Sequence, residues 1–177
     1  MNLLSEGDSV STKKLKIVSV VGFGGLGKTT LVKTVYEKIK RDFDCRAFVP
    51  VGRNADAKKV FIDILLDLGM HESRLIMLDE RQLIDRLRER LENKRYIIVI
   101  DDIWDEKLWE IINLAFSRSN NFGSRLITTT RIVSVSKLCC SSSDHSIYEM
   151  KPLSADDSRR LFYKRIFSHE SGCPVEF

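Results

Sequence analysis

The residues best suited to chemistry lie between Gly22 and Thr29, where the sequence reads GFGGLGKT and fits the pattern G-x-x-x-x-G-K-T. Glycines let a backbone surround an anion without clashes from Cβ atoms, and a helix that follows aims free N–H groups at it. Lys28 is expected to reach the β- and γ-phosphates of a nucleotide, and the Thr29 hydroxyl to hold Mg²⁺. The predicted cofactor-binding residues of this loop are Gly22, Gly24, Gly25, Gly27, Lys28, Thr29 and Thr30.

Two aspartates follow the apolar run Tyr96–Ile100. Because a hard cation prefers carboxylate oxygens, Asp101 is expected to hold Mg²⁺, usually through water. Strand alternation should point Asp102 elsewhere, where it is placed as a catalytic residue that orients or activates an attacking water. The alternative is a turn at the strand end that merely uses aspartates.

A third polar group ends the next apolar strand, at Thr128-Thr129-Thr130-Arg131. Ligands of open α/β sheets bind beyond the carboxyl ends of the strands, so Arg131 could direct its planar set of donors at a γ-phosphate. A surface arginine after a strand is the equally acceptable alternative on spacing alone.

The elements that must position these residues alternate along the chain. Strands are predicted at 16–21, 46–51, 96–100, 124–130 and 146–150. Helices are predicted from about residue 30 to 41, and over 61–68, 79–93, 107–116 and 133–138; a capping box at Ser154-x-x-Asp157 begins a last one. The first of these strands and helices flank the glycine loop, which argues against a chance match to its pattern. Strands that alternate with helices predict the α/β class, with a doubly wound parallel five-stranded sheet.

Composition excludes several other classes. The chain has 177 residues, 43% hydrophobic and 31% charged, and a net charge of +4, which is an ordinary globular balance and no nucleic-acid footprint. No apolar run has the length of a membrane span, and the N-terminus lacks the apolar core of a signal peptide. The four cysteines (Cys45, Cys139, Cys140 and Cys173) show no metal-ligand spacing, so neither zinc nor a disulfide is predicted.

Taken in order, these motifs closely resemble the NB-ARC domain, the nucleotide-binding domain of the STAND class in plant intracellular immune receptors that carry leucine-rich repeats. The resemblance covers about residues 15–168. Its matching segments are the P-loop at 22–31, the block at 43–51, the "kinase-2" segment at 96–104, the sensor strand at 123–131, and the block at 148–153 that runs into Leu161-Phe162.

The resemblance implies a P-loop NTPase fold in which the sensor strand lies between the P-loop strand and the Asp101 strand. It implies an ADP-bound resting state, an ATP-bound signalling state, and Arg131 as the phosphate sensor. Implied partners in a full-length family protein are flanking signalling and leucine-rich-repeat domains and a homo-oligomer. A cytoplasmic or nuclear location follows by default.

Some of the family's motifs lie outside this sequence: the adenine-contacting segment upstream, and the Gly-Leu-Pro-Leu-Ala and Met-His-Asp motifs downstream. The expected division is a linker or remnant at 1–14, the nucleotide-binding domain at 15–170, and the start of a truncated segment at 171–177. Three functions stay open. They are an ADP/ATP switch with slow ATP hydrolysis at most, a P-loop kinase for a small molecule or nucleotide, and a truncated remnant that binds nucleotide weakly.

Overall fold

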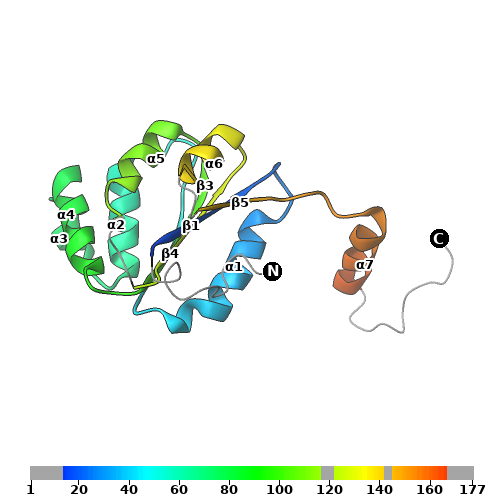
Figure 1. The fold of residues 1–177 in the computed structure, drawn as a ribbon, viewed down its shortest axis with the longest axis horizontal. Helices are drawn as coiled ribbons and strands as arrows, with labels where there is room; N and C mark the ends of the chain where they lie inside the picture. Colours follow the sequence, from blue (N-terminus) through cyan, green and yellow to red (C-terminus); the bar gives the residue numbers. More distant parts are fainter. Residues whose placement is uncertain (1–13, 117–121, 142–144, 167–177) are drawn as a thin grey trace.

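The protein is described here by a computed structural model that covers residues 14–116, 122–141 and 145–166. Five strands form one sheet, shown in Figure 1: β1 (Lys16–Val21), β2 (Cys45–Pro50), β3 (Tyr96–Ile103), β4 (Arg125–Thr130) and β5 (Ser146–Glu149). Their order is β2-β3-β4-β1-β5, and every pair is parallel. The predicted five-stranded α/β sheet is confirmed, and so is the position of the sensor strand β4 between β1 and β3.

Helices cover both faces of the sheet. They are α1 (Lys28–Ile39) with the short 3-10 helix η2 (Lys40–Asp42), α2 (Ala57–Asp67), α3 (Glu72–Leu75), α4 (Glu80–Leu91), α5 (Glu106–Asn113) and α6 (Val133–Cys139). A further helix, α7 (Ala155–Ile166), follows the last strand. Alternate residues of β3 enter different cores. Ile98 and Ile100 pack with α2, α4 and α5, whereas Ile97 and Val99 pack with α1. A strand buried on both faces explains the unbroken apolar run in the sequence.

Several boundaries differ from the sequence-based expectation. The helix after the glycine loop begins at Lys28, and α2 begins at Ala57, where the Asp56 side chain accepts a hydrogen bond from the Lys58 N–H. The helix predicted to about residue 41 is divided into α1, which ends at Ile39, and the 3-10 helix η2. The helix α3 was not predicted, because so short a segment has no apolar period to recognise.

The strand β3 does not end at Asp101 but continues to Ile103. Its register with β4 shifts there, since Ile100 lies opposite Thr128 and Ile103 opposite Thr130. One extra residue of β3 is therefore accommodated, and Asp102 takes a left-handed backbone with φ of 65°. The irregularity therefore falls at the two aspartates.

The last helix, α7, lies away from the sheet in Figure 1, and none of its residues is buried. Its capping box is formed as predicted: the Asp157 N–H donates to the Ser154 hydroxyl oxygen, and that hydroxyl donates to the Asp157 carboxylate. Apolar side chains of the helix, such as Leu161 and Phe162, are exposed. The proposed limits of the nucleotide-binding domain stay a prediction.

Of the cysteines, Cys45, Cys139 and Cys140 are free thiols, and Cys173 lies outside the described residues. None of the described helices combines the length and the apolar character needed to cross a membrane.

Candidate nucleotide-binding site

The glycine loop joins the end of β1 to the start of α1 and leaves the helix end open. Gly25 and Gly27 have left-handed φ values of 82° and 86°, and no atom lies within 4 Å of the place where either Cβ would be. Gly27 is the N-cap, yet no side chain caps the helix and its first turn holds no acidic residue. The first helical hydrogen bond runs from the Leu31 N–H to the Gly27 carbonyl at 2.8 Å, so earlier N–H groups have no helical acceptor. The loop thus presents donors to open space, as an anion site requires.

Lys28 lies under this loop and is only 7% exposed. Its ammonium donates to the carbonyl oxygens of Gly22 at 2.7 Å and Phe23 at 2.9 Å. Burial lowers the pKa of Lys28, the nearby Arg131 lowers it further, and the carboxylates of Asp102 and Asp101 act in the opposite direction. The structure therefore holds a buried cation against loop carbonyls, beside the open helix end.

The first turn of α1 is joined to β3 through Thr29 and Asp101. The Thr29 hydroxyl lies 2.8 and 3.0 Å from the two carboxylate oxygens of Asp101, and the Thr129 hydroxyl of β4 donates to the same carboxylate at 2.6 Å. Asp101 is 5% exposed and, within the described ranges, forms no ion pair. A buried carboxylate that has hydroxyl partners but no cation, with Thr29 beside it, is a donor set suited to Mg²⁺. The two residues predicted to hold the metal therefore lie together.

Asp102 faces a different group of residues from Asp101. Its carboxylate accepts from Arg131 Nε at 3.3 Å and from Trp104 Nε1 at 3.1 Å. Its backbone N–H donates to the Thr129 hydroxyl at 2.8 Å. The two carboxylates thus have different side-chain partners, and the left-handed residue interrupts regular strand alternation at this point. The predicted role of Asp102 toward a water stays a prediction.

Arg131 follows β4 and reaches across the glycine loop. A Cβ built at Gly24 would lie 2.8 Å from Arg131 Nη1, closer than real Cβ contacts allow. Gly24 has no left-handed backbone angle, and the atoms that a Cβ would meet all belong to the end of the Arg131 side chain. The structure thus brings Arg131 to the loop and to Asp102 at once.

Two residues of this site were given no role in the sequence analysis. The Trp104 ring lies beside the guanidinium groups of both Arg131 and Arg53, whose Cζ atoms are 4.8 and 4.4 Å from its centroid. Trp104 stood in a matched motif, whereas Arg53 belongs to the loop after β2, just beyond the matched block at 43–51. The available signal was that Arg53 follows β2, because residues beyond the carboxyl ends of parallel strands lie where ligands of such sheets bind.

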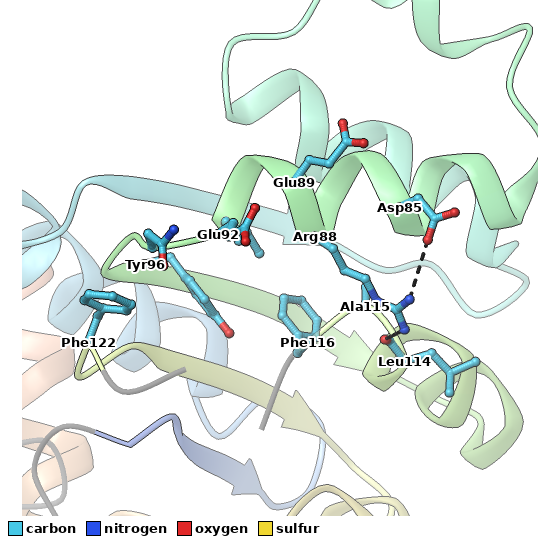
Figure 2. Close-up of a pocket in the computed structure, with 11 residues that line it drawn as sticks. Asp85, Arg88, Glu89, Glu92, Tyr96, Leu114, Ala115, Phe116 and Phe122 are labelled. Carbon is cyan, nitrogen blue, oxygen red and sulfur yellow. Dashed lines mark hydrogen bonds and ion pairs between the residues drawn. The ribbon is translucent and has the colours of Figure 1, made fainter. Parts of the chain in front are cut away.

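A separate cavity of about 740 Å³ lies between α4 and the segment 114–116 that follows α5, near the start of β3 (Figure 2). Tyr96, Phe116 and Phe122 form part of its lining, and carboxylates of α4 such as Glu89 lie at it. Tyr96 begins β3, whereas Asp101 lies near its carboxyl end. The cavity is therefore at the amino ends of the parallel strands, and the glycine loop is at their carboxyl ends.

Comparison with solved structures supports the fold. The protein is similar to the Signal Transduction ATPase with Numerous Domains (STAND) protein with a tetratricopeptide repeat sensor from Pyrococcus horikoshii, with a TM-score of 0.62 and 20% identity over 93% of this chain and 24% of that one. It is also similar to Cdc6p from Pyrobaculum aerophilum, with a TM-score of 0.61 and 16% identity over 86% of this chain and 43% of that one. At such identities the likeness concerns the fold alone.

Sequence comparison gives closer relatives. The chain is 37% identical over 165 residues to disease resistance protein RGA5 of Oryza sativa subsp. japonica, which covers 92% of this chain and 15% of the relative. It is 36% identical over 155 residues to ToMV resistance protein Tm-2(2) of Solanum lycopersicum, which covers 87% of this chain and 17% of the relative. The chain thus spans less than a fifth of the length of these relatives. The NB-ARC domain model matches residues 2–172, and the chain therefore belongs to the NB-ARC family.

Proposed function

We propose that this chain is the ADP/ATP-binding core of a molecular switch in a plant intracellular immune receptor. The observation that carries the proposal is the open end of α1 with the buried Lys28 ammonium beside it. A diphosphate would accept from the free N–H groups of the loop and take the ammonium from the carbonyls of Gly22 and Phe23. Thr30, an exposed residue in the first turn of α1, adds one more N–H group.

Mg²⁺ would be held by Thr29 and Asp101. Their oxygens already lie within hydrogen-bonding distance of each other, and Asp101 is otherwise a buried charge without a cation. When bound, the metal would neutralise charge on the phosphates. The hydroxyl of Thr129 would remain to orient the Asp101 carboxylate.

Arg131 is the residue proposed to distinguish ATP from ADP. It now pairs with Asp102, and a γ-phosphate beside the loop would offer its guanidinium a stronger, doubly hydrogen-bonded partner. Release of Asp102 would leave that carboxylate able to orient a water for slow ATP hydrolysis at most. The switch would therefore consist of one arginine that exchanges a carboxylate for a phosphate.

The wider role rests on the relatives. Because several of them are named as disease or virus resistance proteins, a function in plant defence is proposed for the protein to which this domain belongs. Flanking signalling and leucine-rich-repeat domains, a homo-oligomer of the active full-length form, and a cytoplasmic or nuclear location belong to the same proposal.

The test is to extract and identify nucleotide that co-purifies with the chain, with Lys28→Ala beside it. ADP in the unsubstituted protein and none in the variant is the expected result. A monodisperse sample without nucleotide in either form, and without affinity for added ADP or ATP, would contradict the proposal and favour a truncated remnant. Transfer of phosphate from ATP to a small acceptor would favour a kinase instead.

A further inference from the structure

The Trp104 side chain connects three charged groups at the site. Its indole N–H donates to Asp102 at 3.1 Å, and its ring lies beside the guanidinium groups of Arg131 and Arg53. A cation beside an aromatic face is attracted by the ring's quadrupole. Trp104 therefore contacts both members of the Asp102–Arg131 ion pair, and also an additional arginine.

The charges around this ring are unbalanced. Two guanidinium groups share one ring, but among the described residues the only carboxylate that pairs with either one is that of Asp102, which pairs with Arg131. Arg53 is exposed and, across the residues that the structure describes, forms no hydrogen bond or ion pair. Its attraction to the ring is offset by repulsion from Arg131, since like charges at short range oppose each other. Because Arg53 already lies over the ring that donates to Asp102, it is the nearby cation that can pair with this carboxylate when Arg131 leaves.

Arg131 has a second place to go. Its Nη1 atom lies so near Gly24 that a Cβ there would clash, and its charge acts on Lys28 under the same loop. A nucleotide phosphate bound by this loop would compete directly with Asp102 for the guanidinium.

We propose that Trp104 and Arg53 are positioning residues that set the preference of this site for a nucleoside triphosphate over a diphosphate. The proposal rests on the proposed function above and deepens it. Trp104 retains Arg131 on Asp102 and so favours the diphosphate. Arg53 has the opposite effect, because it repels Arg131 at the shared ring and remains there as a cation near Asp102 when the γ-phosphate draws Arg131 away. The loop after β2, which carries Arg53, is thereby coupled to the phosphate state.

The experiment measures the dissociation constants of ADP and of a non-hydrolysable ATP analogue, with Mg²⁺, and takes their ratio. Trp104→Leu removes the ring and the indole N–H, and should shift the ratio toward the triphosphate by about 3- to 10-fold. Trp104→Phe keeps a ring and should shift it less. Arg53→Gln should shift the ratio toward the diphosphate, and Arg53→Lys, which keeps the charge, should shift it less than Arg53→Gln.

A double variant separates action through the ring from a general effect of charge. If Arg53 acts through Trp104, Arg53→Gln should have little further effect in the Trp104→Leu protein, because coupled residues are not additive. Arg81→Gln, which removes an exposed charge on α4, is the matched control and should leave the ratio unchanged.

The outcomes distinguish this inference from the proposed function. Equal ratios in the unsubstituted protein and in both single variants, with nucleotide still bound, would overturn the inference alone. Additive effects in the double variant would also overturn it. Absence of nucleotide binding by the unsubstituted protein would contradict the proposed function, and this inference with it.

Discussion

The helices α1 and α4 have the same length, 12 residues, but their N-termini are built in opposite ways. At α4 the Asp79 carboxylate accepts from the Gln82 N–H at 2.8 Å, and the Gln82 side chain accepts from the Asp79 N–H at 3.0 Å. At α1 the cap is Gly27, which has no side chain to offer. One helix end is satisfied by its own residues, and the other is left for an external anion.

The contrast distinguishes a helix end that stabilises the fold from one that is available to a ligand. A capping box contributes to stability and leaves little affinity for a ligand, because its donors are occupied. An uncapped end costs stability and retains its affinity for phosphate. Substitutions at these two helix ends and at their partners should differ in effect, from the largest to the smallest in the order that follows.

The largest effect is expected when open space at the glycine loop is filled. Gly25 and Gly69 have matching φ values of 82° and 84°, and a Cβ at either position would meet no atom within 4 Å. Gly69 follows the C-cap of α2 and lies away from the glycine loop. Each change to alanine should lower the free energy of unfolding by about 1–2 kcal/mol. Only Gly25→Ala should also weaken ADP binding, by roughly 10- to 100-fold, because it displaces a phosphate from charge-assisted hydrogen bonds. Calorimetric titration and urea unfolding measure the two effects; equal ADP affinities would refute the anion site at this loop.

The next effect concerns Asp101, the hydrogen-bond partner of Thr29 in α1. The side chain of Gln82 accepts a hydrogen bond at its own helix end, whereas the Thr29 side chain forms hydrogen bonds with Asp101 of strand β3. If that pair holds Mg²⁺, the metal should raise affinity for an ATP analogue about 10-fold over EDTA, and less than about 2-fold in Asp101→Asn. Fluorescence titration with and without EDTA checks this. An unchanged dependence on Mg²⁺ in the variant would remove Asp101 from the metal site.

Removing the cap of α4 should affect stability and leave binding intact. Asp79→Ala deletes the side-chain acceptor for the Gln82 N–H, and should lower the free energy of unfolding by about 1 kcal/mol, the usual cost of a lost cap. ADP affinity, measured by the same titration, should not change. A large loss of affinity would show that the two helix ends are coupled and would break the comparison.

The smallest effect is expected when α1 is made to resemble α4. The first turn of α4 contains Glu80, but that of α1 holds no acid, and Thr30 there is exposed. Thr30→Glu should stabilise the free protein slightly through the helix dipole and weaken ADP binding about 2- to 5-fold, because the new carboxylate repels the phosphates. Thr30→Gln, which has the same shape without the charge, should have little effect. If both variants lower the affinity equally, the field at the helix end is not the cause.

Much of this architecture could be predicted from the sequence because its signals are local. The glycine pattern, the apolar run before Asp101 and the alternation of strands with helices each fix a short segment, and parallel strands then bring their ends to one edge. The meeting of Thr29 with Asp101 follows from that geometry.

The rest depends on contacts that no local pattern specifies. The left-handed conformation of Asp102 arises from an extra residue in β3, and the stack around Trp104 assembles side chains from three separate loops. The close approach to Gly24 is made by a guanidinium whose residue follows a different strand. Such features can be found only when the chain is seen folded.

The strand order also has a consequence for the time at which the site can exist during synthesis. The strand that carries the glycine loop, β1, pairs with Arg125–Thr130 on one side and with Ser146–Glu149 on the other. A ribosome that adds 5–20 residues per second would need roughly 5 to 20 seconds between β1 and β4. Through that interval both edges of an apolar strand lack their partners, which makes the nascent chain prone to aggregation and a client for chaperones. The phosphate site follows the first strand of the sheet, yet it cannot be completed until β4 has been synthesised.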